Sequence, residues 1–367
     1  MGGFGTKLGT QLIADAVIGA AQLEIALRNQ VLFGGRLGTN LVELGFVTLD
    51  DLAHQLEEQT GFPVASASEL EHAPSDLLAQ LGADFAVGRG VIPLGVFAGS
   101  TTYAVAFVDP FDGATVDDTA QLLNGPVVPY IVPELRGLYF LERHFGLPRH
   151  ARYVRAGRGS RPARPGERRR EQPTAGIVMP PTVTLEPRRR KKTSLPMPLT
   201  DGECLPVAQT VAALATAPNR DAIGRALCAF GRGRFSAFVV FSVRDANAIG
   251  WCGVAPYASG DTIALLAIPL GGVSALQEAH DAERTFVGFP PSNPHPIESD
   301  LWRTLCRGAD PVEVIVAPIV IGQRVVTLLY GQGPSDGTIS DSARNDMTEV
   351  AAALSNAYNR LCAAVTP

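Results

Sequence analysis

The sequence predicts a multidomain protein of mixed α and β structure, with four parts along its 367 residues. A tandem helical repeat is expected at residues 1–60, and a small α/β subdomain at 61–148. A disordered linker is expected at 149–200, and a second α/β domain, built on an antiparallel sheet, at 201–367. Three observations predict this order: an internal duplication, a change of composition near residue 149, and a strand–turn–strand–helix pattern near the C-terminus.

The duplication is the most specific of these signals. Residues 7–30 align with residues 36–59 at a constant offset of 29, and the five residues VLFGG separate the copies. The identical pairs are Leu8/Leu37, Gly9/Gly38, Thr10/Thr39, Leu12/Leu41, Leu23/Leu52, Leu27/Leu56 and Gln30/Gln59. Two equivalent structural units are therefore expected.

Each copy predicts two short helices. In the second copy, leucines spaced i, i+4 and i+7 from Leu37 share one helical face. Gly45 then ends this helix as a left-handed cap, and Thr48 begins the next as an N-cap. Ala16 stands where the second copy has Gly45, so the turn of the first copy is expected to sit differently.

Residues 61–148 alternate between strand and helix patterns, which predicts a small α/β subdomain. A loop is expected at 60–70, one helix at 74–90, strands near 90–97 and 101–108, a helix after Val108, a strand at 126–132 and a closing helix at 133–146.

Between Arg149 and Lys192 there are fourteen basic and three acidic residues and no apolar periodicity, which predicts a disordered linker.

The C-terminal part predicts helices at 204–217 and 219–232 and two antiparallel strands at 236–245 and 247–255. Residues 261–270 are mostly apolar and predict a strand leading into a helix. A strand, a tight turn at Gly322–Gln323 and a second strand follow within 312–333, and residues 340–362 predict a final amphipathic helix capped by Ser340.

Composition excludes several classes of function. The formal net charge of −5 argues against nucleic acid as the main partner, although the basic linker itself attracts phosphates. Five cysteines without a CxxC pair predict buried thiols in a reducing compartment and no metal site. Neither a signal peptide nor an apolar run of membrane-spanning length is visible, which predicts a cytoplasmic protein.

The duplicated unit resembles the N-terminal domain of type II secretion and type IV pilus assembly ATPases, the GspE N-terminal or MshEN family. The second copy has the family's repeat of Arg-Leu-Gly, a glycine with aliphatic neighbours, and LxxxLxxQ; the first departs from it at Lys7 and Ala16. The P-loop of those ATPases, GxxxxGK[ST], is absent from this sequence. The resemblance covers about residues 1–148 and implies the regulatory module without the motor.

Many members of that family bind cyclic di-GMP through the repeats, and the resemblance implies such a site here. The residues carried over are Lys7, Leu8, Gly9, Leu23, Leu27 and Gln30 from the first copy, Arg36, Leu37, Gly38, Leu52, Leu56 and Gln59 from the second, and Asp109. A cation and helix amides favour phosphate, leucines pack on guanine faces, and glutamine both donates and accepts. Alternatively, the same residues are folding signals and the domain is only a protein-interaction module.

The end of the chain resembles a GAF domain, a ligand-sensing fold. The resemblance lies in the order of strand, turn, strand and closing helix over residues 312–362. It implies a sensor or a site of homodimer contact, and no residue in it specifies a ligand.

These expectations define one function and its alternatives. The resemblance implies a regulator that binds cyclic di-GMP. The absence of a GxSxG, HExxH or Cys–His arrangement predicts that it is not an enzyme and needs no cofactor. It would act through an unidentified protein partner in secretion, pilus or motility control. The alternatives are a nucleotide-free adaptor and, through the linker, a nucleic-acid-associated protein.

Overall fold

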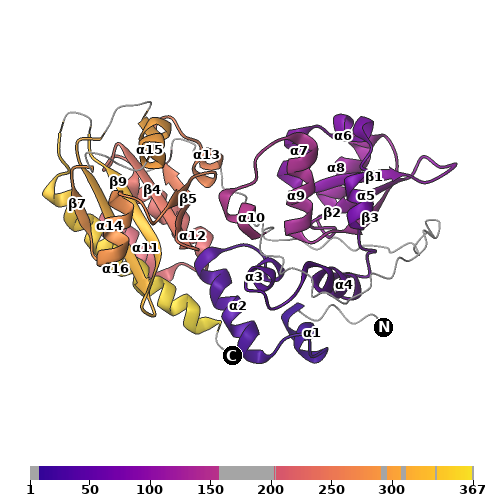
Figure 1. Cartoon of the computed structure of the whole chain (residues 1–367), viewed down its shortest axis with the longest axis horizontal. Coiled ribbons are helices and arrows are strands. Elements are labelled where there is room, and N and C mark those ends of the chain that lie inside the picture. The colour runs from indigo at the N-terminus through magenta and orange to yellow at the C-terminus, as the bar shows by residue number, and fades with distance from the viewer. Residues whose placement is uncertain are drawn as a thin grey trace. The chain divides into compact units, whose positions relative to one another are not determined.

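The computed structural model describes residues 8–156, 202, 204–290, 296–306, 311–334 and 337–365. The chain forms two compact units, shown in Figure 1. Unit 1 comprises residues 1–26, 35–149 and 153–192, and unit 2 comprises residues 27–34, 150–152 and 193–367.

The duplicated region folds as two helical pairs. The helices are α1 (Leu8–Ala14), α2 (Ala20–Phe33), α3 (Leu37–Glu43) and α4 (Leu49–Thr60). Equivalent apolar residues of the two copies share one core: Leu12 and Leu41 are fully buried, and Ile18 and Val47 are almost so. The division between the units crosses α2, whose residues from Leu27 onward belong to unit 2.

A three-stranded sheet forms the centre of the rest of unit 1. Its strands are β1 (Val91–Val96), β2 (Tyr103–Phe107) and β3 (Val127–Ile131), in the order β1-β2-β3. The first two strands are antiparallel, and the last two are parallel. The helices around the sheet are α5 (Ala67–Glu71), α6 (Ser75–Leu81), α7 (Ala83–Arg89), α8 (Gly113–Leu123) and α9 (Glu134–Phe145).

Alternating residues of β1 and β2 separate two cores. Ile92, Ala104 and Ala106 face the core that contains Leu70 of α5 and residues of α7 and α9. Val91, Val105 and Phe107 face the core that contains residues of α6 and α8. Helices therefore cover both faces, as the alternating strand and helix patterns predict.

Two local expectations in this subdomain were wrong. The single helix expected at 74–90 is broken into α6 and α7, because Gly82 adopts φ +75° and ψ 151°, outside the helical region. The loop expected at 60–70 contains the short helix α5, which begins at a capping box between Ser66 and Glu69.

The predicted linker begins with a short helix. Residues Ala151–Ala156 form α10. Residues 157–201, which hold most of the predicted linker, lie outside the described residues.

The C-terminal unit is built on a six-stranded antiparallel sheet in the order β6-β5-β4-β9-β8-β7. Figure 1 labels β5, β4, β9 and β7 of this sheet. Its strands are β4 (Ala237–Arg244), β5 (Asn247–Val254), β6 (Ala267–Pro269), β7 (Phe286–Gly288), β8 (Val314–Ile321) and β9 (Arg324–Gln332). Its helices are α11 (Val207–Thr216), α12 (Arg220–Gly231), α13 (Gly260–Ala264), α14 (Ala275–Ala282), α15 (Pro296–Cys306) and α16 (Asp341–Ala364).

Both faces of this sheet are covered. Helices α11, α12 and α16 pack on one face, where Val240 and Leu329 are fully buried. Helices α13, α14 and α15 pack on the other, where Phe241 and Tyr330 are buried. The predicted mixed fold with an antiparallel C-terminal sheet is therefore confirmed.

Both hairpin turns expected here are present. Residues Gly322 and Gln323 connect β8 to β9 with φ values of +55° and +67°. Asp245 and Ala246 connect β4 to β5 with φ values of +46° and +55°. Two consecutive left-handed residues match the twist of the flanking strands.

The expectation for residues 261–270 was wrong in its order. A helix, α13, comes first and the edge strand β6 follows it. The Ser259 side chain accepts a hydrogen bond from the Thr262 backbone N–H, so the helix begins where the sequence pattern had indicated a strand. The elements α14, β7 and α15 were not predicted.

In the described part of the chain, no helix combines the length and the apolarity needed to cross a membrane.

Candidate ligand-binding site

The Arg-Leu-Gly segment of the second repeat opens helix α3. Arg36 is the N-cap residue, with φ −80° and ψ 154°, and 44% of its side chain is exposed. Gly38 is buried, and a Cβ atom there would lie 2.9 Å from Cδ1 of Leu52. The glycine therefore allows the α4 leucine to contact the backbone of α3 directly.

The first repeat reproduces this packing. A Cβ atom at Gly9 would lie 2.7 Å from Cδ1 of Leu23, the counterpart of Leu52, and 3.3 Å from Cδ2 of Leu37. Both glycines are buried in contact with the equivalent leucine of their own copy. The close packing of the glycine against the leucine is thus the same in both repeats. Lys7, which would supply the cation of this copy, lies outside the described residues.

The turns of the two repeats are also the same, so the expectation of a different first turn was wrong. Ala16 adopts the left-handed conformation with φ +55°, and Gly45 has φ +70°. The hydrogen bond from Ala16 N to Ile13 O is 3.0 Å long, and the equivalent bond from Gly45 N to Val42 O is 2.9 Å. The core on either side of the turn holds Ala16 in a conformation that alanine disfavours.

Arg36 lies between two carboxylates of the α/β subdomain. Its Nη2 is 3.6 Å from Oδ2 of Asp109, and its Nε is 3.7 Å from Oε1 of Glu134. The other oxygen of Glu134 accepts a hydrogen bond of 2.5 Å from the hydroxyl of Thr39. The structure therefore brings together Arg36 and Asp109, two residues that the family resemblance had placed in one site.

The remaining residues of the predicted site belong to the helical pairs. Leu8, Leu23, Leu37 and Leu56 are partly buried against the repeat core, and Leu52 is 3% exposed. Gln59 lies in the last turn of α4 and is partly buried. Leu27 and Gln30 follow Leu23 on one face of α2, but they lie in the part of α2 assigned to unit 2.

Glu134 and Thr39 are the site residues that the sequence analysis missed. Glu134 follows Pro133 at the start of α9, where a carboxylate is favoured by the helix dipole. The Pro-Glu pattern predicts the start of a helix, but it does not indicate that the Glu134 side chain contacts Arg36. Thr39 was recognised as a repeated position, but its contact spans 95 residues of sequence.

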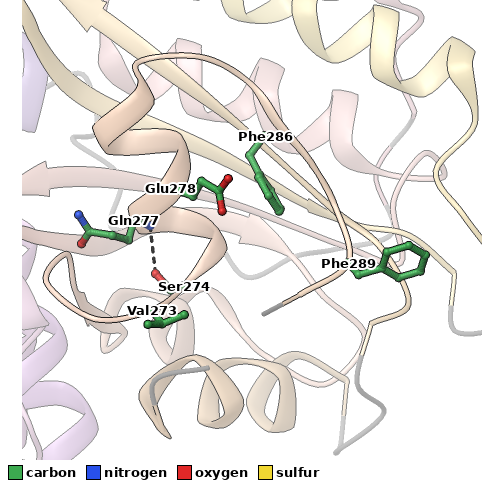
Figure 2. A pocket seen from close by; sticks show the side chains of 6 residues that line it. All are labelled: Val273, Ser274, Gln277, Glu278, Phe286 and Phe289. Carbon is green, nitrogen blue, oxygen red and sulfur yellow. Dashed lines mark hydrogen bonds between the residues drawn. The ribbon is translucent and has the colours of Figure 1, made fainter. Parts of the chain in front are cut away.

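A separate pocket lies at the start of α14 in unit 2. Its volume is about 310 Å³, and it is lined by Val273, Ser274, Gln277, Glu278, Phe286 and Phe289 (Figure 2). Figure 2 shows the hydrogen bond between the Ser274 side chain and the Gln277 backbone, which is 3.0 Å long. The lining has one carboxylate and no cation, so it offers no charge partner to an anionic ligand.

A buried carboxyl group supports the same helix. Glu298 is fully buried, and its Oε1 accepts a 3.0 Å hydrogen bond from the Ala275 backbone N–H. Burial raises the pKa of Glu298 to about 7. Elsewhere in the described residues, no group of three or more His, Cys, Asp or Glu side chains is arranged to hold a metal ion.

Comparison with known proteins identifies the domain next to the repeats. Residues 60–151 match the MshEN domain. The expected resemblance to the MshEN family is thereby confirmed, and the matched residues begin at the end of α4 and cover the α/β subdomain.

Individual relatives are similar over limited regions. The type IV pilus assembly ATPase PilB of Thermus thermophilus is 28% identical over 145 residues, which are 39% of this chain and 16% of that protein. The chain thus spans about a sixth of the length of this curated relative.

Two solved structures are also similar to parts of the chain. One, of MshE with cdg, is 28% identical and covers 38% of this chain and 99% of its own, with a TM-score of 0.32. The other is the GAF domain of a phosphoenolpyruvate-protein phosphotransferase from Coxiella burnetii. It is 15% identical and covers 43% of this chain and 93% of its own, with a TM-score of 0.35.

Proposed function

We propose that this protein is a non-enzymatic regulator that binds cyclic di-GMP through its duplicated N-terminal repeats. The ligand regulates the protein and is not turned over, and no further cofactor is needed. The bound state is communicated by contact with another protein in secretion, pilus or motility control. The C-terminal unit is the candidate for sensing or for contact with a second copy.

The observation that carries the proposal is the equivalence of the two repeats. Gly9 with Leu23 and Gly38 with Leu52 make the same close contact, so both copies have the same glycine–leucine packing at the start of their first helix. Cyclic di-GMP has two identical halves, each with one guanine and one phosphate. A duplicated structural unit matches such a ligand better than it matches a ligand with a single base.

The side chains around Arg36 have the chemistry that a guanine or a phosphate requires. A guanidinium group donates to guanine O6 and N7 or to phosphate oxygens. A carboxylate such as Asp109 accepts from the N–H groups of a guanine edge. Arg36 has 44% of its side chain exposed, so a ligand can reach it without unfolding the repeat core.

Isothermal titration calorimetry with cyclic di-GMP tests this proposal in the full chain. We expect the wild type to bind, and Arg36→Ala and Gln59→Ala to weaken binding by roughly tenfold or more. Arg89→Ala is the matched control, because Arg89 is another arginine of unit 1 that is 48% exposed and pairs with Asp112 and Asp118. The control should bind as the wild type does.

Two results would reject parts of the proposal. If the wild type released no heat up to high micromolar ligand and did not compete with a labelled analogue, the nucleotide-free adaptor would be the better account. If the wild type bound but Arg36→Ala and Gln59→Ala were unaffected, the binding site would lie elsewhere in the protein.

A further inference from the structure

We infer that Glu134 is a positioning residue for the nucleotide ligand, acting through Arg36; this inference rests on the proposed function. Glu134 comes from the α/β subdomain and belongs to neither repeat. It reaches the second repeat at two points: Oε1 is 3.7 Å from Nε of Arg36, and Oε2 accepts the 2.5 Å hydrogen bond from Thr39.

The two contacts of Glu134 have different roles. Thr39 is 2% exposed, so its hydroxyl is a fixed donor within the folded repeat. The Glu134 side chain is 18% exposed and has one oxygen bound to this donor, so the other oxygen is held at one position. The negative charge of the carboxylate is further stabilised at the start of α9, because the N-terminus of a helix carries a partial positive charge.

Arg36 is the group that this arrangement restrains. It is an N-cap residue with a long, 44% exposed side chain, which has many rotamers when it is unrestrained. Glu134 lies against Nε, on the stem side of the guanidinium group, and Asp109 lies against Nη2. A guanidinium group restrained at Nε loses less conformational entropy when its outer N–H groups bind a ligand.

The first repeat differs at the equivalent position. Thr10, the counterpart of Thr39, is exposed, whereas Thr39 is buried. Among the described residues, the contact of a buried threonine with the Glu134 carboxylate thus belongs to the second repeat. The two halves of a symmetric ligand would then be held by unequal contacts.

The test is a set of variants titrated with cyclic di-GMP in the full chain. Glu134→Gln removes the charge but keeps a similar shape, and we expect binding to weaken by roughly three- to tenfold. Thr39→Val removes the hydroxyl that holds Glu134 and should weaken binding in the same direction. Thr39→Ser keeps a hydroxyl donor and should restore affinity to near the wild-type value, which a purely structural role of the threonine methyl group would not produce.

A double-mutant cycle identifies the route of the effect. If Glu134 acts through Arg36, Glu134→Gln should cause no further loss in an Arg36→Ala background. Glu142→Gln is the matched control: it removes a carboxylate from the same helix, where Glu142 pairs with Arg149, and should leave affinity unchanged. Thermal unfolding of each variant checks that unit 1 remains folded.

The outcomes separate this inference from the proposed function. If the wild type does not bind cyclic di-GMP, both the positioning role of Glu134 and the proposed function are rejected. If the wild type binds and Glu134→Gln binds equally well, or binds more tightly because Glu134 competes with the ligand for Arg36, the positioning role is overturned and cyclic di-GMP binding stands. A loss that persists unchanged in the Arg36→Ala background would also overturn it.

Discussion

The left-handed conformation of Ala16 leads to a reciprocal pair of stability changes. Ala16 has φ +55° and its counterpart Gly45 has φ +70°, in turns with equivalent hydrogen bonds. Ala16→Gly should therefore stabilise the repeat region, and Gly45→Ala should destabilise it. Both positions are exposed, and a Cβ atom at Gly45 would meet no atom within 4 Å, so no side-chain clash contributes to the change.

The expected magnitude follows from two opposing terms. A non-glycine residue in the left-handed region costs about 1–2 kcal/mol. Glycine has a more mobile unfolded state, which offsets about 0.4–1 kcal/mol of the gain. The free energy of unfolding should thus rise by roughly 0.5–1 kcal/mol for Ala16→Gly and fall by a similar amount for Gly45→Ala. For a domain of about 150 residues this corresponds to a melting shift of roughly 1–4 °C.

Differential scanning calorimetry of the full chain measures both shifts in the transition of unit 1. Gly113→Ala is the control, because Gly113 begins α8 without a positive φ and a Cβ atom there would meet nothing within 4 Å. It should not lower the melting temperature. If Ala16→Gly were destabilising, or if Gly45→Ala and Gly113→Ala behaved alike, the reasoning from backbone strain would be refuted.

Two further predictions concern packing and pH. Gly38→Ala should lower the free energy of unfolding of the full chain in urea by roughly 1–3 kcal/mol, because its Cβ atom would lie 2.9 Å from Leu52. In a Leu52→Ala background this cost should disappear. Equal costs in both backgrounds would contradict the claim that the cost comes from contact with Leu52. The raised pKa of Glu298, about 7, means that the folded state favours the protonated form, so stability should fall as pH rises from about 4.5 to 7. Glu298→Gln, measured by thermal unfolding, should therefore be more stable than the wild type at pH 8 but not at pH 4.5, and an equal difference at both pH values would contradict this.

Much of the fold could be predicted because its signals are local. The duplication predicted equivalent helical pairs, and Thr48 and Gly45 marked helix ends that the structure confirms. Helix and strand alternation predicted the α/β subdomain, and the final hairpin and helix were predicted at nearly their observed ends. Each of these features depends on residues close together in the chain.

The errors arose where distant contacts or single backbone angles decide the structure. Ala16 adopts a glycine-like angle because the repeat core requires the turn, which alanine's own preference does not predict. The contact between Thr39 and Glu134 joins residues 95 positions apart, and nothing in either local sequence indicates it. Residues 263–270 are apolar throughout, so their pattern could not distinguish a capped helix from a strand.

The most direct test of the central claim is the stoichiometry and affinity of cyclic di-GMP binding by the full chain. Two equivalent repeats that hold the two halves of one ligand predict one cyclic di-GMP per chain, and roughly tenfold or greater weakening in Arg36→Ala. The Arg89→Ala control should bind with wild-type affinity. The absence of binding by a folded wild-type chain, or equal affinity of Arg36→Ala and Arg89→Ala, would contradict the account.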